Sequence, residues 1–259
     1  MPARHYSILA RPDTPSAHHG NRQKPKRNAN RIRRAYRVLV DFGALVSSAQ
    51  RDGWASGSGD VDSVRRQATS LGWAEVATRR GDPPVSVLRP AEPGAAHPRS
   101  LSAQYGLGQQ PLHTDGAHLA DPPDIVVLVS SHPSPTPTLV WTAAAHVGES
   151  PGPIWSRLAA FGHGMFLVHS GRDSFYVPVF SDGRYRYDPG CMSACDARAR
   201  QVEEYLASQL ADAVACEWTG HGQVLVVDNR RALHARAAVA EGDTDRELTR
   251  IAFRVKAAQ

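Results

Sequence analysis

The chain has 259 residues, a formal net charge of +5 and three cysteines, Cys191, Cys195 and Cys216. This length fits one large domain or two small ones and suffices to bury a core without disulfide bonds. A few cysteines, odd in number, exclude a disulfide scaffold and favour a reducing compartment, so we expect a soluble, cytoplasmic protein. No apolar run approaches the roughly 20 residues that cross a bilayer, and we expect neither a membrane segment nor a secretory signal.

The positive charge is concentrated near the N-terminus, where eight Lys and Arg residues lie between Arg22 and Arg37 among Pro, Asn and Gln. Such a composition is typical of a solvated, poorly ordered arm. Contact with nucleic acid is the functional alternative, but only Tyr36 interleaves, which is too little for a stacking platform. We predict a basic, disordered arm over residues 1–35, one domain over residues 36–259, and no nucleic-acid partner.

The first elements of the domain are read from their flanking residues. We place its start near Tyr36–Val40 and predict a helix over Asp60–Leu71, with Asp60 as N-cap and Gly72 as the stop. Val85–Pro90 alternates like a strand, whereas Glu92–Gln110 is rich in Pro, Gly, Ser and Ala and is predicted to be a long loop. A loop of this length inside a compact domain is often functional.

Short apolar segments separated by turn residues fill the remainder of the chain. We predict strands at Asp124–Ser130, Thr138–Thr142 (after a Pro-rich turn), Gly164–His169, Ser174–Val179, Arg184–Asp188, Gln223–Asp228 and Leu248–Val255. Two helices are predicted, at Pro153–Phe161 and at Cys195–Val214, the second opening with the capping pattern formed by Ser193 and Asp196. Many short strands indicate a mainly β sandwich or barrel and not alternating βαβ units.

A candidate metal site begins in the segment His113-Thr-Asp115. Side chains two residues apart lie on one face of an extended segment, so one imidazole and one carboxylate can reach the same ion. A second histidine would complete the two-His-one-carboxylate set that leaves coordination positions open in non-haem iron(II) oxygenases. His234 follows an apolar strand and a polar turn in VVDNRRALHAR, and we predict that the fold brings it to His113 and Asp115.

Two segments carry a resemblance to a known family. Residues 111–129 (PLHTDGAHLADPPDIVVLV) resemble the metal-binding stretch of the taurine dioxygenase and clavaminate synthase-like oxygenases, and residues 227–250 (VDNRRALHAR…RELTR) resemble the C-terminal signature of that superfamily. The resemblance spans about residues 85–255. It implies a double-stranded β-helix (jelly roll) core with flanking α-helices, an Fe(II) cofactor, 2-oxoglutarate as co-substrate and O2 as oxidant.

The same resemblance implies residues for the co-substrate. An arginine about a dozen positions after the second histidine binds the distal carboxylate of 2-oxoglutarate in the family, and here Arg246 has that position. A guanidinium suits this task because its planar fork binds a carboxylate with two hydrogen bonds. Thr138 begins TLVW, which resembles a stretch whose hydroxyl binds the same carboxylate, and Arg250 is carried over to the primary-substrate side.

The sequence gives weaker evidence for the residues that bind the substrate. Ser102 and Gln104 lie in the SLSAQY segment just before the metal motif and are expected to line the pocket, while Arg186 is a candidate reader of a substrate carboxylate. We therefore expect a small molecule with a carboxylate or amino-acid moiety. Hydroxylation with conversion of 2-oxoglutarate to succinate is the expected reaction. Desaturation or cyclisation would use the same site, and Asp115 disfavours halogenation, because related halogenases lack the carboxylate ligand.

Two other classes of function remain open at this level. One is a non-catalytic jelly-roll binding protein, although such a protein would be expected to have lost a ligand or the arginine. The other is a hydrolytic zinc site, for which Asp228 would be the general base. His118 and the other histidines are read as core or surface residues, and the C-x3-C pair lacks the second pair that a structural zinc needs. The sequence does not define an oligomeric state.

Overall fold

The computed structural model describes residues 41–79, 81–143, 159–171 and 173–255. The chain divides into two units, residues 1–37 and 38–259, and the second is described here by itself. The predicted arm over residues 1–35 and the predicted domain start at Tyr36–Val40 lie outside the described residues, as does most of the helix predicted at Pro153–Phe161. Residues 159–163 are helical. None of the helices in the described ranges is long and apolar enough to cross a lipid bilayer.

The largest sheet is antiparallel, with strand order β1-β12-β4-β14-β2, and β3 also pairs with β14. Its strands are β1 (Trp54–Ser58), β2 (Ala74–Glu75), β3 (Val85–Leu88), β4 (Ile125–Ser130), β12 (Gln223–Asp228) and β14 (Leu248–Arg254). Every residue of β4 is buried. Side chains of a strand alternate between the two faces of a sheet, so a fully buried central strand means that both faces are covered.

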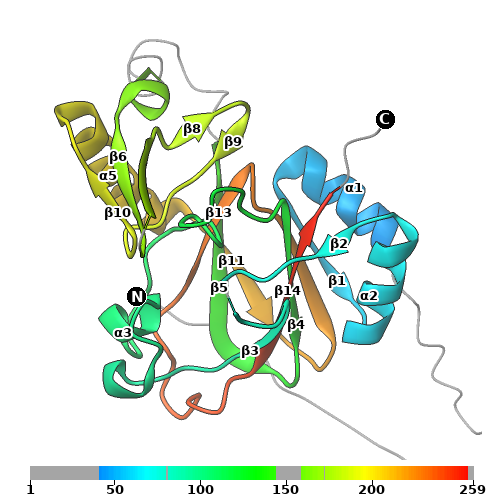
Figure 1. Ribbon diagram of the computed structural model, residues 1–259. Helices are drawn as coiled ribbons and strands as arrows, with labels where there is room; N and C mark the ends of the chain where they lie inside the picture. Colours follow the sequence, from blue (N-terminus) through cyan, green and yellow to red (C-terminus); the bar gives the residue numbers. More distant parts are fainter. Residues whose placement is uncertain (1–40, 80, 144–158, 172, 256–259) are drawn as a thin grey trace, which may run out of the picture. The chain divides into compact units, whose positions relative to one another are not determined.

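A second antiparallel sheet of three strands has the order β11-β5-β13. Its strands are β5 (Ser134–Thr142), β11 (Val214–Trp218) and β13 (Ala232–Arg236). Its inner face packs on the largest sheet, because Val140 and Trp218 share one buried cluster with Val126, Leu225 and Leu248 of the larger sheet. Figure 1 shows the strands of the two sheets facing each other, with β5 and β13 beside β4 and β14.

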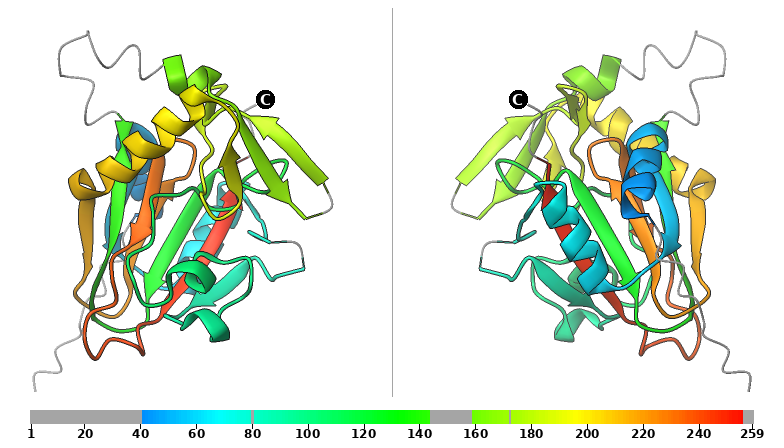
Figure 2. Two further views of the ribbon diagram at one scale, coloured as in Figure 1. Left: turned by 90° about the vertical axis from the view of Figure 1, so that its left-hand side faces the viewer. Right: turned by 90° about the vertical axis from the view of Figure 1, so that its right-hand side faces the viewer.

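Helices cover the outer faces of the two sheets. The helices α1 (Phe42–Asp52) and α2 (Val61–Ser70) bury Phe42, Val46 and Val64 against the outer face of the largest sheet. The helix α5 (Ala197–Ser208), followed by the 3-10 turn η3 (Gln209–Asp212), covers the smaller sheet on the opposite side, as both views in Figure 2 show. The domain is therefore mainly β, with helices on both sides of a two-sheet core.

The remaining elements lie around this core. A small sheet joins β10 (Met192–Ala194), β6 (Phe166–Ser170) and β7 (Asp173–Val177), and a hairpin joins β8 (Phe180–Ser181) and β9 (Arg184–Tyr185). The segment before the metal motif contains the 3-10 turn η1 (Pro93–Ala95) and the short helix α3 (Leu101–Tyr105).

The predicted helix at Asp60–Leu71 is confirmed, with the Asp60 carboxylate accepting a hydrogen bond from Ser63 N. Four other expectations are corrected. The predicted loop at Glu92–Gln110 contains α3, and β5 begins at Ser134, so that the predicted Pro-rich turn is strand. The predicted cap Ser193 lies in β10, whereas α5 starts at Ala197 with Asp196 as its N-cap, whose carboxylate accepts a hydrogen bond from Ala199 N. The helix also ends before β11 and does not reach Val214.

Candidate metal centre and co-substrate pocket

Backbone pairing brings the predicted ligands together. His234 lies in the middle of β13, and His113 lies in the extended segment that leads towards β4. The two residues form an isolated antiparallel bridge, in which each backbone N–H donates to the carbonyl oxygen of the other at 2.9 Å. Asp115 follows two residues later and lies on the same side of the segment as His113. The fold therefore assembles one site from two distant parts of the sequence.

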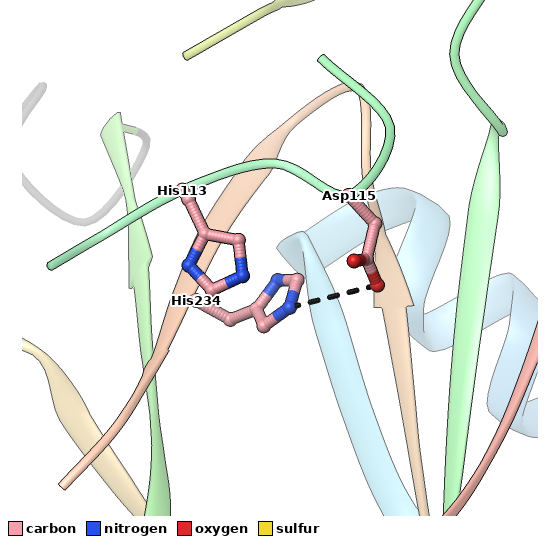
Figure 3. Close-up of side chains that lie close together, drawn as sticks. All are labelled: His113, Asp115 and His234. Atoms are coloured by element: carbon pink, nitrogen blue, oxygen red, sulfur yellow. Dashed lines mark ion pairs between the residues drawn. The ribbon is translucent and has the colours of Figure 1, made fainter. Parts of the chain in front are cut away.

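The three side chains converge as Figure 3 shows. One potential ligand atom from each of His113, Asp115 and His234 lies within 4.8 Å of the others. The imidazole centroids of His113 and His234 are 4.5 Å apart, and His234 Nε2 lies 3.8 Å from Asp115 Oδ2. This is the set of residues predicted from the sequence, and its geometry can hold one metal ion.

The charge states of the buried groups suit metal binding. Burial, together with the neighbouring His113, lowers the pKa of His234 to about 3, so the imidazole is neutral and its lone pair is available. Burial alone would raise the pKa of Asp115, but Arg250 and then the two histidines favour its charged form and bring the pKa below the ordinary value. Neutral imidazoles and an ionised carboxylate are the protonation states that ligands require.

The hydrogen bonding of Asp115 and His113 leaves atoms of both side chains available to a metal. Asp115 Oδ2 is buried and has no hydrogen-bond partner among the described residues, although a buried polar atom normally has one. His113 Nδ1 lies 3.1 Å from the carbonyl oxygen of Pro111, which accepts its proton and leaves Nε2 as the free donor atom. Two nitrogens and one carboxylate with open positions match non-haem iron(II).

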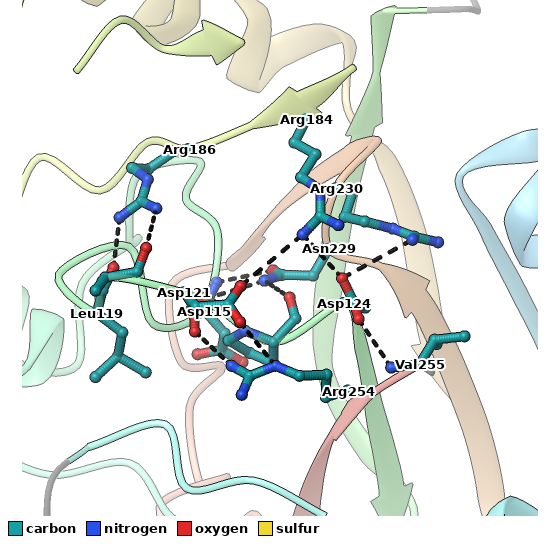
Figure 4. A network of polar contacts seen from close by, with 12 residues as sticks. Asp115, Leu119, Asp121, Asp124, Arg184, Arg186, Asn229, Arg230, Arg254 and Val255 are labelled. Atoms are coloured by element: carbon teal, nitrogen blue, oxygen red, sulfur yellow. Dashed lines mark hydrogen bonds and ion pairs between the residues drawn. The ribbon is translucent and has the colours of Figure 1, made fainter. Parts of the chain in front are cut away.

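Asp115 is held in place by two partners from other parts of the chain. Arg250 Nη1 donates to Asp115 Oδ1 at 2.8 Å, and the same guanidinium donates to Thr78 Oγ1 and Ser86 Oγ. Asn229 Oδ1 accepts from the backbone N–H of Asp115 at 2.9 Å, and Asn229 Nδ2 donates back to the Asp115 carbonyl oxygen at 3.0 Å. Figure 4 shows Asn229 against this backbone. The carboxylate is thus oriented before any ion binds.

Arg246 lies in the same cavity, buried to 3% exposure, and is held by Thr138. Its Nη2 donates to Thr138 Oγ1 at 3.3 Å and its Nε to the Thr136 carbonyl oxygen at 3.2 Å. Burial and the nearby Arg236 lower the pKa of Arg246 to about 10. No carboxylate among the described residues forms an ion pair with it. A buried cation without an anion is costly, so this end of the cavity is built to receive one.

The cavity joins the metal ligands to this cation. Its volume is about 160 Å³, and its lining includes His113, Asp115 and His234 together with Thr138, Arg246 and Arg250. Leu128 and Leu248 provide apolar wall between the charged groups. A small diacid held by a metal at one end and by a guanidinium at the other has the polarity that this lining complements.

Two of the other predicted residues, Gln104 and Arg186, are placed differently from the prediction. Ser102 lines the cavity, as expected, and accepts a hydrogen bond from Gln110, whereas Gln104 is exposed on α3 and does not line it. Arg186 lies outside the lining, and its guanidinium donates to the carbonyl oxygens of Ala117, Leu119 and Ala120. Figure 4 shows its guanidinium hydrogen-bonded to the loop that follows the metal motif. Its charge is therefore used in the fold and not on a ligand.

Sequence reasoning missed several lining residues, namely Arg79, Arg99, Gln110, His118, Asp188 and Arg236. Arg236 was within reach, because it lies two residues after His234 and so shares its strand face. Its Nη2 donates to the carbonyl oxygens of Gly106 and Gly108. The others come from loops whose approach to the metal depends on tertiary structure, and no local spacing marks them.

Searches against protein-family models and against curated proteins give no match. Solved structures do match. An asparagine oxygenase in complex with Fe(II), 2S,3S-3-hydroxyasparagine and succinate has a TM-score of 0.64 and 17% identity, over 83% of this chain and 78% of that one. The non-heme iron oxygenase OrfP, in complex with Fe and alpha-ketoglutaric acid, has a TM-score of 0.60 and 16% identity, over 83% and 79%.

PvcB from Pseudomonas aeruginosa matches with a TM-score of 0.57 and 18% identity, over 82% of this chain and 80% of that one. A further structure describes PvcB as an Fe, alpha-ketoglutarate dependent oxygenase. The resemblance seen in the two sequence motifs is confirmed at the level of the fold. The chain has the fold of the iron, 2-oxoglutarate-dependent oxygenases of the taurine dioxygenase and clavaminate synthase-like type.

Proposed function

We propose that this protein is an Fe(II)- and 2-oxoglutarate-dependent oxygenase that acts on an amino acid or a related small molecule. One observation carries the proposal: a two-His-one-carboxylate set and a buried, anion-free arginine line the same cavity. His113, Asp115 and His234 would hold the iron, and Arg246 with Thr138 would hold the distal carboxylate of the co-substrate. The facing sheets are read as the double-stranded β-helix, or jelly roll, of these enzymes.

The reaction expected at such a site is hydroxylation. One substrate C–H bond, 2-oxoglutarate and O2 are converted to an alcohol, succinate and CO2, with one oxygen atom entering the alcohol and the other succinate. Iron supplies the activation of O2, and the chain supplies position, charge and exclusion of water. Desaturation and cyclisation use the same residues and depend on how the substrate is held.

An amino-acid substrate is supported by the matched structures and by the lining. The solved asparagine oxygenase contains hydroxyasparagine, and OrfP has been solved with (3S)-hydroxy-L-Arg. In the present chain the cavity offers both signs of charge beyond the metal ligands, with Arg79 and Asp188. A zwitterion needs both.

Succinate formation tests the proposal. The full chain, loaded with Fe(II) under anaerobic conditions and then given 2-oxoglutarate and O2, should form succinate, and an amino-acid substrate should increase the rate. His234→Ala should lose both metal binding and turnover while remaining folded. His169→Ala is the matched control, because His169 is an exposed histidine whose ring hydrogen-bonds Ser193 and lies outside the cavity lining. If His234→Ala bound iron as tightly as the wild type in a metal titration, the ligands would be assigned wrongly.

A non-catalytic binding protein is the second candidate. It would bind the ion and 2-oxoglutarate without consuming O2. Oxygen uptake and succinate release, measured together on the same sample, separate the two functions.

A further inference from the structure

The cavity lining has an excess of positive charge. Among the described residues it contains six arginines but only two carboxylates, Asp115 and Asp188. Four of the arginines already have partners or a role in the proposed function: Arg250 binds Asp115, Arg246 faces the co-substrate, Arg236 binds two carbonyl oxygens, and Arg89 forms an ion pair with Glu247. Of the two others, Arg79 has one long ion pair among the described residues, with Asp82, and Arg99 has none there.

Arg79 is placed beside the metal ligands. It follows Thr78, whose hydroxyl accepts a hydrogen bond from Arg250, and Arg250 in turn binds Asp115. Its side chain is half-buried, and its one ion pair among the described residues, with Asp82, is 4.0 Å long. Burial, followed by the charge of Arg250, lowers the pKa of Arg79. This guanidinium therefore points a weakly compensated charge into the cavity.

Asp188 faces the same space from the other side of the metal motif. The residue before it, Tyr187, is fixed to Thr114 by a backbone hydrogen bond of 2.7 Å, so Asp188 is anchored next to the metal-binding segment. Its carboxylate accepts from Gly190 N at 2.8 Å and, among the described residues, forms no ion pair with a lysine or arginine. It is the one carboxylate of the described lining that is not expected to bind the metal.

His118 shows that these charges surround one region. Burial lowers the pKa of His118, Asp188 acts in the opposite direction, and Arg79 and Arg99 add to the lowering. All four residues line the cavity. The charge of Arg79 also helps to lower the pKa of Asp115, whereas the side chain of Arg99 is exposed to solvent. The region thus offers a cation near the metal, an anion and a second cation farther out.

We propose that the primary substrate is an α-amino acid whose side chain carries an acidic group, with Asp188 receiving its ammonium group and Arg79 and Arg99 its two acid groups. This inference rests on the proposed oxygenase function. Two guanidiniums without a close ion pair among the described residues, and one carboxylate without a cationic partner there, complement two anions and one cation. A cationic amino acid would need a second carboxylate in the lining, and the described residues do not provide one.

Matched acid and amide substrates test this charge pattern. Aspartate and asparagine, and likewise glutamate and glutamine, have nearly the same shape and differ in one charge, and cysteate distinguishes a sulfonate from a carboxylate. The readout is succinate formation by the Fe(II)-loaded full chain with 2-oxoglutarate and O2. We expect one acid to exceed its amide at least about tenfold in kcat/KM, the effect of one charge-assisted contact.

The outcomes separate the two proposals. Preference for an amide or for arginine would overturn the acidic-substrate inference and leave the oxygenase function standing. Slow succinate formation without any stimulation by the acids would do the same. Absence of succinate under every condition, with iron bound, would refute the oxygenase function and the inference with it.

Substitutions in the cavity lining give a test that does not depend on the fraction of folded, active enzyme. In Arg99→Gln the acid-over-amide ratio of kcat/KM should fall about tenfold to a hundredfold, because the contact to the side-chain acid is lost. Arg89→Gln is the control, since Arg89 lines the same cavity but is neutralised by Glu247, and it should keep the wild-type ratio. Asp188→Asn should raise KM for the acid and the amide alike. A ratio is unaffected by the fraction of folded enzyme, and an unchanged ratio in Arg99→Gln would overturn the assignment.

Discussion

Arg246 is the residue on which binding of 2-oxoglutarate depends most directly. In Arg246→Ala the far carboxylate would remain in a buried pocket without its partner, and removing one member of a buried ion pair costs about 3–5 kcal/mol. At about 1.4 kcal/mol per tenfold, we expect KM for 2-oxoglutarate to rise by roughly two to three orders of magnitude. Arg246→Lys should restore only part, because an ammonium lacks the bidentate fork.

The measurement is succinate formation as a function of 2-oxoglutarate concentration. Iron affinity without co-substrate serves as the internal control and should barely change, since Arg246 is not a ligand. An unchanged KM for 2-oxoglutarate in Arg246→Ala would place the clamp elsewhere, with Arg236 as the nearest buried alternative in the lining.

Arg250 supports the metal through Asp115. Its Nη1 lies 2.8 Å from Asp115 Oδ1, so Arg250→Ala should free the carboxylate to rotate and lower iron affinity about 10- to 100-fold, the usual effect of losing an outer-shell partner. Anaerobic Fe(II) titration measures this. Arg254→Ala is the control, because Arg254 lies on the same strand but pairs with Asp121 away from the cavity. Equal iron affinities of the two variants would contradict the support role.

At the scale of single residues, the sequence predicted what local geometry determines. Alternation along HTD placed His113 and Asp115 on one side, and the polar turn after an apolar strand pointed to His234. The partner of Arg250 could not be read in the same way. It depends on where β14 lies relative to the metal segment, and that follows from pairing with β4, which local spacing does not encode.

Strand β13 carries His234, yet its five residues were not predicted as a strand. The segment ALHAR is short and fully buried, so it lacks the apolar–polar alternation that marks a half-exposed strand. Helix α1 was missed for a related reason. Its buried residues Phe42, Val46 and Ala49 have the spacing of a helical face, but two serines interrupt the apolar residues and weaken that pattern. Longer strands such as β4 and β12 had enough Val, Ile and Leu to be recognised.

Gly53 couples α1 to both sheets. It ends α1 with φ of +91°, and a Cβ there would overlap the methyl group of Thr142 on β5. Gly81 has nearly the same φ, +89°, with open space around its Cα. Both Gly→Ala variants should be destabilised by the backbone strain of about 1–2 kcal/mol, and Gly53→Ala by about 1–3 kcal/mol more from the clash.

Urea unfolding of the two glycine variants isolates the steric part as the difference between them. The comparison works because the backbone penalty is common to both. Equal unfolding free energies would mean that β5 yields to the added methyl group and that the junction is not tightly packed.

The stability of the whole domain should depend on alkaline pH through its aromatic cluster. Burial raises the pKa of Tyr185 to about 12, from an ordinary value of 10.0, so the folded state favours the protonated phenol. Its contribution is fully present below about pH 10 and is lost as the pH rises from about 10 to about 12. Burial also raises the pKa of Tyr187, in the same direction.

Unfolding free energies measured by urea titration at several pH values from about 9 upwards would show this loss. Tyr185→Phe removes the titrating group while keeping the ring that packs on Trp141 and Phe161, so its decline above about pH 10 should be shallower than that of the wild type. Tyr176→Phe is the control, because Tyr176 is 62% exposed on β7. A slope in Tyr185→Phe equal to the wild-type slope would rule out this linkage.

The reciprocal bridge between His113 and His234 has a consequence for how fast the protein takes up its metal. Both hydrogen bonds join backbone groups, so the two imidazoles are neighbours before an ion arrives. Metal binding should then require only loss of water from the ion and ligand exchange, with no folding step. It should occur in a single kinetic phase whose observed rate is proportional to metal concentration. In metal-free protein the amide protons of His113 and His234 should already exchange slowly with deuterium, as protected backbone groups do. Rapid exchange at these two amides would mean instead that the metal itself closes the site.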